Sequence, residues 1–235
     1  MSSPADLRLD WCSTQAARYA VEHWHYSRSM PAGKSNKIGV WEHGKFIGVV
    51  FFSRGANRNL GKPYGLQQEE IVELTRVALT GHQAPVTRIV AIALRLLRQH
   101  NPGLRLIVSY ADPRKGHHGG IYAGGGWLYV GKTKQAECLY ALASSGREIH
   151  KRTIDSRDRI LRSAAVKQGI LRPVDTWKHK YLMPLDLAMR QQLAPLAIPY
   201  PKRCAGGDTK DTPPVQGGEG GSTPTPALQA PQANQ

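Results

Sequence analysis

A hydroxyl, a phenol and a carboxylate follow closely on one another in the segment Ser109-Tyr110-Ala111-Asp112, directly after the largely apolar run 104–108. Such a run is typical of a buried strand, which would carry these groups to its carboxyl end. Open α/β sheets bind their ligands at that edge. We therefore expect a site there, with Asp112 as an acid–base group and Ser109 as a weaker candidate. The alternative is that Asp112-Pro113 only begins a turn.

A further charged candidate, Arg76, belongs to the alternating run 71–79, which is typical of a central strand. Burying its charge without a partner would be costly, so we expect it to meet a carboxylate such as Asp112 or a ligand phosphate. Structural ion pairing is the alternative. Glu73 stands three residues before Arg76 and is expected to point to the opposite face of the strand.

Aromatic and imidazole side chains gather where the first predicted helix ends, in His23-Trp24-His25-Tyr26. At a helix end, His25 and Tyr26 can face a cleft and act as an acid, a base or a stacking surface. The alternative is that Trp24 belongs to the core while the two histidines are ordinary surface groups.

Residues that could bind a metal are present but poorly grouped. A two-histidine, one-carboxylate iron site can be assembled from His25, the pair His117-His118 and Asp112. Adjacent histidines seldom bind one metal, however, and the surrounding glycines favour a loop. The cysteines are widely spaced and include no Cys-x-x-Cys pair, so we expect reduced thiols and no zinc site; they are Cys12, Cys138 and Cys204.

The charge of the chain points to a polyanionic partner. Its 235 residues carry a formal net charge of +15, with a pI of about 10. Residues 204–235 hold one lysine and three acidic residues, so residues 1–203 carry +17. Lysine and arginine displace the counterions condensed on nucleic acid, which makes double-stranded DNA the leading partner. A basic ribosomal or membrane-surface protein is the alternative.

Two segments are candidates for the DNA contact. Residues 147–172 are basic and poorly periodic, and we expect them to meet duplex phosphates through Arg152, Arg157, Arg159 and Arg162. The loop after the third predicted strand, 46–52, offers Arg54, Asn57 and Arg58. For each segment the alternative is a solvated loop.

The chain is expected to form one folded domain, 1–203, followed by a tail, 204–235. The tail is rich in Gly, Pro, Gln and Thr and is predicted to be disordered, because it has too few large apolar residues to repay the entropy of ordering. No run approaches the ~20 apolar residues of a membrane span, and no signal peptide opens the sequence. We therefore expect a cytoplasmic protein with no membrane partner.

Strand-like and helix-like periodicities alternate across 1–203. Strands are predicted at 7–9, 37–40, 46–52, 71–79, 104–112, 127–130 and 176–183. Helices are predicted from Ser13 to Trp24, at 86–99 and at 185–193, with one short turn within 116–125. The order predicts an α/β fold with a mixed central sheet and helices on both faces.

This order resembles the GNAT acetyltransferase fold, an α+β arrangement. The segment 121–127 resembles the place where GNAT enzymes end a short tyrosine-bearing helix in glycine, which implies that Tyr122 protonates a leaving group. The resemblance places acyl-coenzyme A at the start of helix 86–99; the matching residues are Gly81, His82, Thr87 and Arg88. The usual basic-x-x-Gly-x-Gly/Ala turn has only one glycine here, which argues against standard binding, although a helix N-terminus still favours an anion.

The whole folded part resembles the Mom family of phage Mu-like viruses. The resemblance is carried in order by His23-Trp24-His25-Tyr26-Ser27, Met30-Pro31-Ala32-Gly33-Lys34, Arg54-Gly55-Ala56-Asn57, Glu73-Leu74-Thr75-Arg76-Val77-Ala78-Leu79, Ser109-Tyr110-Ala111-Asp112 and Trp177-Lys178-His179-Lys180-Tyr181-Leu182. It implies modification of adenine in DNA to N6-(carbamoylmethyl)adenine, in the host cytoplasm, as a protection against restriction enzymes. The implied active-site residues are Tyr26, Arg76, Asp112 and Tyr122, with His25 and Ser109 as weaker additions.

That product limits the chemistry. Its N6 is joined through a methylene carbon, so acyl transfer from acetyl-coenzyme A alone cannot form it. Either the small-molecule donor is a different compound, or further steps or a redox metal intervene. Two other functions compete. The first is an N-acetyltransferase acting on a protein or small amine, which would not explain the net charge of +17 on residues 1–203. The second is a non-catalytic DNA-binding protein, which would not explain the polar residues at the strand ends.

Overall fold

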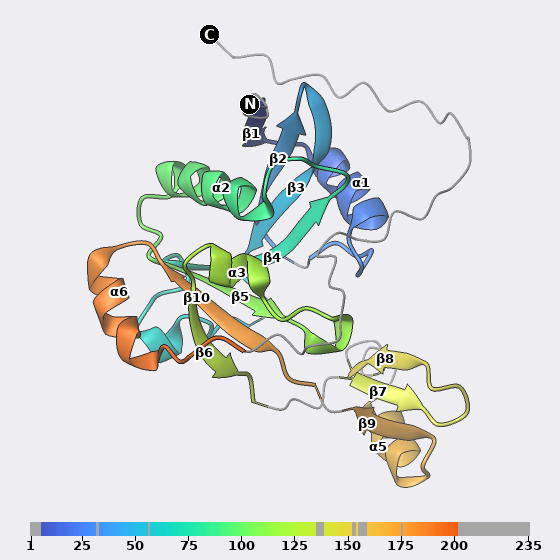
Figure 1. The fold of residues 1–235 in the computed structure, drawn as a ribbon. Helices are drawn as coiled ribbons and strands as arrows, with labels where there is room; N and C mark the ends of the chain where they lie inside the picture. Colours follow the sequence, from blue (N-terminus) through green and yellow to red (C-terminus); the bar gives the residue numbers. More distant parts are fainter. Residues whose placement is uncertain are drawn as a thin grey trace, which may run out of the picture.

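The computed structural model describes residues 6–31, 33–55, 57–134, 139–151, 154, 159–174 and 176–201, and its strands form two sheets (Figure 1). The larger sheet has seven strands in the order β1-β2-β3-β4-β5-β10-β6. They are β1 (Leu7–Trp11), β2 (Ser35–Glu42), β3 (Lys45–Ser53), β4 (Ile71–Leu79), β5 (Leu106–Ala111), β6 (Leu128–Lys132) and β10 (His179–Pro184). Only β4 and β5 pair in parallel within this sheet, so it is mixed, as predicted.

A β-α-β unit forms the centre of the sheet, as the sequence predicts. β4 ends at Leu79, α2 (Val86–His100) crosses over, and β5 returns beside β4 with Leu106 opposite Ile71. A parallel pair needs such a crossover, because a tight turn can join only antiparallel strands. β10 then lies between β5 and β6, although it comes last in the sequence.

Helices cover both faces of the large sheet, which confirms the predicted layers (Figure 1). Side chains of β3 alternate between the faces. Val49 and Phe51 pack against α1 (Thr14–Trp24), whereas Val50 and Phe52 pack in the cluster that holds the buried residues of α2. The short α3 (Gly120–Gly124) lies on the α2 side, and α6 (Leu187–Leu193) packs on the side of α1.

The two long helices form for reasons that are visible in the sequence. Ser13 caps α1, because its Oγ accepts a hydrogen bond of 3.1 Å from the Ala16 N–H. Buried residues recur along α2 at intervals of one, three and four, and they are Ile89, Val90, Ala93, Leu94 and Leu97. Each large apolar side chain buried in this way contributes about 1.5–3 kcal/mol.

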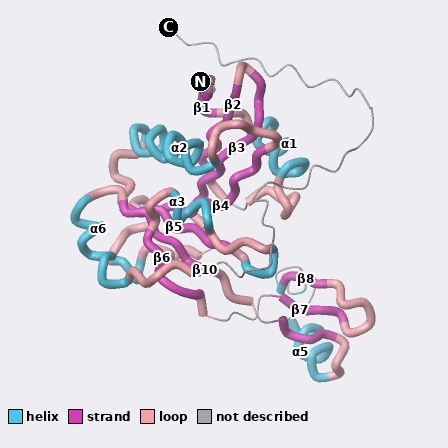
Figure 2. The backbone as a smooth tube through the Cα atoms, viewed as in Figure 1, coloured by secondary structure: helices cyan, strands magenta, loops and turns pink. Residues whose placement is uncertain are grey.

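The smaller sheet is formed by a segment for which the sequence predicted no elements. Its strands are β7 (Leu139–Leu142), β8 (Glu148–His150) and β9 (Leu171–Val174), in the order β8-β7-β9, and α5 (Arg159–Lys167) packs on β9. Strands of three or four residues are too short for an alternating pattern to be recognised. In Figure 2 this sheet and α5 stand apart from the large sheet. An ion pair between Arg114 and Glu148 connects the two.

The predicted tail, 204–235, lies outside the described residues. Within the described part of the chain, no helix combines the length and the apolar character needed to cross a bilayer.

Candidate functional site

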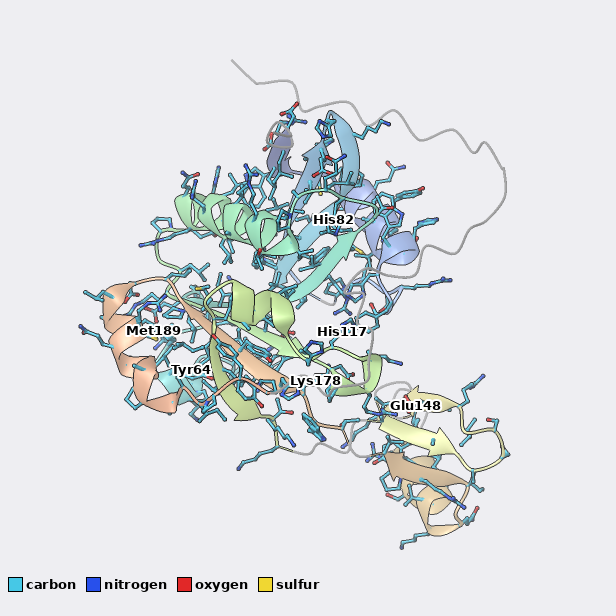
Figure 3. The ribbon with its side chains drawn as sticks, viewed as in Figure 1. Tyr64, His82, His117, Glu148, Lys178 and Met189 are labelled. Carbon is cyan, nitrogen blue, oxygen red and sulfur yellow. The ribbon has the colours of Figure 1, made fainter. Side chains whose placement is uncertain are left out.

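A cavity lies where β4 and β5 diverge. Their parallel pairing ends at Leu74 opposite Ser109; beyond that point β4 continues beside β3 to Leu79, while β5 continues beside β10 to Ala111. The opening has a volume of about 510 Å³. Its lining includes the end of α1, the second half of β4, the start of α2, the turn after β5 and α3. His82 and His117, labelled in Figure 3, come from the two sides of this divergence.

Arg76 enters the cavity because β4 contains a bulge. Phe51 of β3 lies opposite Arg76 and Phe52 lies opposite Leu74, which leaves Thr75 as the extra residue. The bulge reverses the alternation, so Arg76 points to the same face as Glu73. The prediction that these two side chains point to opposite faces is therefore wrong.

The guanidinium of Arg76 is only partly satisfied. Its Nη1 donates a hydrogen bond of 2.7 Å to the carbonyl of Thr75. Its Nε is buried and has no hydrogen-bond partner among the described residues. No carboxylate in that part of the chain lies within ion-pair distance, so the expected pair with Asp112 is not formed. Burial lowers the pKa of Arg76, and Tyr26 and Glu73 partly offset this.

His25 is a neutral hydrogen-bond donor in this site. Its Nδ1 accepts the backbone N–H of Ser27 at 3.1 Å and lies 2.8 Å from the Ser27 hydroxyl. Because an N–H only donates, Nδ1 carries no proton, and the proton of the neutral ring is on Nε2. Burial, reinforced by Arg76 and His117, lowers the pKa of His25 to about 3. The alternative of an ordinary surface histidine does not fit, since the residue is 9% exposed.

Tyr26 lies next to His25 but reaches toward solvent. It is 54% exposed, and its ring centroid lies 4.3 Å from that of His25 and 5.1 Å from that of His117. Both Tyr26 and His117 line the cavity. An exposed phenol beside an imidazole can stack on a planar ligand.

Ser109 and Tyr122 form a buried hydrogen-bonded pair at the point where the strands diverge. The Ser109 Oγ donates to the carbonyl of Leu74 at 2.8 Å, and the Tyr122 hydroxyl donates to Ser109 Oγ at 2.7 Å. Ser109 is fully buried and does not line the cavity, whereas Tyr122 does. The ring of Tyr122 stacks on Tyr181, with centroids 4.7 Å apart. Ser109 therefore positions Tyr122.

Asp112 lines the cavity at the end of β5 and also begins a turn, so both interpretations of this residue hold. Its Oδ1 accepts the backbone N–H of Arg114 at 3.0 Å. This hydrogen bond fixes one carboxylate oxygen and thereby the orientation of the group. The described residues contain no cluster of three or more His, Cys, Asp or Glu side chains that could hold a metal, so the combination of Asp112 with the histidines is not assembled as a ligand set.

Most of the residues predicted to bind acyl-coenzyme A at the start of α2 lie outside the cavity. Of the four residues predicted there, only His82 lines the cavity; Gly81, Thr87 and Arg88 do not. The backbone N–H groups of Gln83 and Ala84 donate to the two carboxylate oxygens of Glu42, each at 2.8 Å. Glu42 is 5% exposed, and these hydrogen bonds lower its pKa against the effect of burial. Pro85, the next residue, has no N–H to offer.

The predicted DNA contacts are placed unevenly. In the loop after β3, Arg54, Asn57 and Arg58 are exposed, and the Asn57 side-chain oxygen accepts the Asn59 N–H at 2.8 Å. Arg152 and Arg157 lie outside the described residues, and Arg159 belongs to α5. The Arg162 guanidinium lies over the ring of Tyr140 at 5.8 Å. The loop and the small sheet do not join into one surface through any contact described here.

A model of the Mom protein family matches residues 6–202. The chain belongs to the Mom protein family. The match covers both sheets and every residue placed in the cavity above. The family resemblance expected from the sequence is thus confirmed.

One curated Mom protein and three solved structures are similar to this Mom-family chain. The methylcarbamoylase Mom of Escherichia phage Mu is 26% identical over 130 residues, which are 54% of each chain, so this chain spans about half the length of that relative. Two structures are acetyltransferases. One is a putative enzyme from Acinetobacter baylyi, with a TM-score of 0.45 and 11% identity over 79% of this chain and 96% of that one. The other is a probable GNAT-family enzyme from Chromobacterium violaceum, with a TM-score of 0.46 and 12% identity over 78% of this chain and 84% of that one.

The third structure is FeeM, an N-acyl amino acid synthase from uncultured soil microbes. It has a TM-score of 0.45 and 10% identity over 81% of this chain and 97% of that one. Structural similarities with such low sequence identity describe the backbone fold and say nothing about the reaction.

Sequence reasoning missed Glu42, which shapes the site from the end of β2. It stands directly before the turn of the first hairpin, where a glutamate is an ordinary solvated residue. Its partners Gln83 and Ala84 are 41 and 42 residues away, and their N–H groups leave no mark in the sequence. Only the scarcity of glycine in the turn 80–85 gave a signal that this helix start is unusual.

Proposed function

We propose that the chain is a transferase that converts adenine in DNA to N6-(carbamoylmethyl)adenine and so protects the DNA from restriction. Membership of the Mom family and the similarity to the phage Mu methylcarbamoylase support this proposal. The observation that carries it is the convergence of Tyr26, Arg76, Asp112 and Tyr122 on one cavity. These side chains come from four separate segments, and only the fold brings them together.

The acceptor is the exocyclic amine of adenine. Its lone pair is shared with the ring, so N6 is a weak nucleophile and cannot be reached inside the base stack. The base is flipped out of the duplex at a cost of a few kcal/mol. Tyr26 is the stacking surface for the flipped base, because it is exposed at the cavity and lies beside the ring of His117.

Asp112 accepts the proton that N6 loses when its bond to the methylene carbon forms. A carboxylate held by the Arg114 N–H keeps one oxygen in place and turns the other toward the cavity. Tyr122 donates its phenolic proton to the leaving group, and for this step its hydroxyl turns from Ser109 Oγ toward the leaving atom. The hydrogen bond to Ser109 keeps the phenol in position without filling the cavity.

The positive charge of the chain supplies affinity for the duplex. The small sheet with its turns and α5 presents exposed Arg147, Lys167 and Arg172, and the Arg114–Glu148 ion pair joins the sheet to the turn that follows Asp112. A duplex bound along this sheet would therefore lie close to the cavity. In this proposal the enzyme works in the cytoplasm of the host, where phage DNA is replicated.

Mass spectrometry of nucleosides tests the proposal. DNA from cells that express the wild type should contain carbamoylmethyl-adenine. Asp112→Asn, which keeps the shape and loses the base, should reduce the modified fraction by about 10²–10⁴-fold. Asp6→Asn on an exposed residue is the matched control and should have no effect.

Two results would contradict the proposal in different ways. Unmodified adenine in DNA from cells that contain folded wild type would overturn the assigned reaction. Equal modification by wild type and Asp112→Asn would remove Asp112 from the mechanism. Acetylation of a protein or small amine, with no change in DNA, would favour an N-acetyltransferase instead.

A further inference from the structure

The start of α2 is an anion site that the protein fills with its own carboxylate. Backbone N–H groups at a helix start attract anions, and here the two that precede Pro85 are bound to Glu42. Glu42 is almost fully buried, so water does not compete for these hydrogen bonds. A pyrophosphate bound at this turn would have to displace a buried carboxylate, which would then be left without its partners.

Arg76 is the cationic group of the cavity that remains short of a partner. Its Nη1 is bound to the Thr75 carbonyl, and its buried Nε has no partner among the described residues. The Nε–H and the adjacent Nη2 form the edge with which a guanidinium holds a carboxylate through two parallel hydrogen bonds. A buried donor on that edge costs free energy until an acceptor arrives.

The surroundings of Arg76 favour a small planar anion. The cavity of about 510 Å³ must admit an adenine ring as well as the donor. His25 contributes a neutral ring to the lining, with its proton on Nε2, so it can donate to an oxygen without adding charge. The exposed basic residues face solvent and are better placed for DNA phosphates than this buried edge.

We propose that the donor is a small molecule whose leaving part carries a carboxylate held by the Nε edge of Arg76, and that Glu42 excludes donors carried on a pyrophosphate such as coenzyme A. The bond from the methylene carbon to the leaving part breaks as the bond to N6 forms, so the carbamoyl group stays on the methylene carbon, Asp112 takes the N6 proton and the leaving part departs with the carboxylate. The inference rests on the proposed function, because it names the donor class of that reaction. It makes Arg76 the binding group for the donor and Glu42 a specificity-determining residue. In this proposal the anion is bound at the β4 bulge, by Arg76, and not at the start of α2.

Binding measured without DNA tests the donor class. We would record ¹⁵N–¹H spectra of the full chain and follow the Arg76 Nε–H signal, assigned by its loss in Arg76→Gln. Acetate should shift this signal, whereas acetamide, of the same size but without charge, should not. In Arg76→Gln, acetate binding should be at least about tenfold weaker. Equal responses to acetate and acetamide, or undiminished binding in Arg76→Gln, would overturn the proposal, as would a response of this signal to duplex DNA alone.

Coenzyme A tests the role of Glu42 in the same spectra. In wild type it should leave the N–H signals of Gln83 and Ala84 unchanged. In Glu42→Ala, which frees both groups, it should shift them; Glu69→Ala on an exposed residue is the control. If Glu42→Ala does not fold, Glu42→Gln keeps one acceptor oxygen and should show a smaller shift. Saturable shifts in wild type would refute the exclusion of coenzyme A.

These experiments can fail independently of the proposed function. They do not require the enzyme to modify DNA, so the spectra alone decide whether acetate binds at Arg76. Nucleoside analysis decides whether adenine is modified, whatever the donor is.

Discussion

The neutral state of His25 makes the stability of the protein depend on pH. In an unfolded chain this histidine takes up a proton near pH 6.5, whereas in the folded protein its pKa is about 3. Between these values the unfolded chain binds more protons, so the free energy of unfolding falls as the pH falls. From pH 7.5 to pH 5 the loss due to His25 is about 2 kcal/mol, at 1.36 kcal/mol for each pH unit below 6.5.

Urea unfolding at the two pH values measures this loss. The variant His25→Asn keeps an acceptor for the Ser27 N–H but cannot titrate, so its stability should fall by about 2 kcal/mol less than that of the wild type. His43→Asn is the control, because His43 is exposed in a turn with a φ of 51° that asparagine tolerates. If the wild type and His25→Asn lose the same stability, the assigned proton position and the burial argument are both wrong.

Four further changes test other parts of the structure. Ser109→Ala should cost about 1–3 kcal/mol in urea unfolding and lower the modified fraction of DNA, because Tyr122 loses its buried acceptor; unchanged activity would show that Tyr122 needs no such support. Gly119→Ala should cost more than about 2 kcal/mol, since Gly119 has a φ of +81° and an added Cβ would lie 2.3 Å from the Tyr181 ring; a thermal melt that matches the wild type would contradict this. Tyr26→Phe should keep DNA modification within about tenfold, while Tyr26→Ala should reduce it further, as expected for stacking; the reverse order would assign the role to the hydroxyl. Charge reversal of Arg147 and Arg172 should weaken duplex binding and flatten its dependence on salt, as measured by fluorescence anisotropy; unchanged binding would remove the small sheet from the interface.

The large sheet could be predicted because its elements carry strong local signals. Ser13 and the apolar spacing of α2 define the two long helices, and the apolar-rich run 71–79 is typical of a strand, although the bulge at Thr75 interrupts its alternation. Each signal lies within one element, and the short turns between them leave few topologies to choose from. The small sheet could not be predicted, because its strands hold only three or four residues and β9 pairs with β7, which lies about 30 residues earlier in the sequence.

The candidate site was predictable in its members but not in its geometry. Asp112 and Tyr26 follow the ends of predicted elements, Arg76 is a charge within a predicted central strand, and all three line the cavity. Their mutual arrangement depends on the bulge at Thr75, which follows from pairing with β3 and has no local signature. The same holds for Glu42, whose importance comes from a contact across 42 residues.

The position of β10 has a consequence for how the protein is made. One wall of the cavity is β5, and β5 is an unprotected edge until residues 179–184 pair with it. During synthesis the ribosome must therefore complete β6, the whole small sheet and β10 before that wall is supported. A nascent or truncated chain that lacks β10 would expose two strand edges and would leave one wall of the cavity unsupported. The cavity is therefore complete only when nearly all of the described chain has been translated.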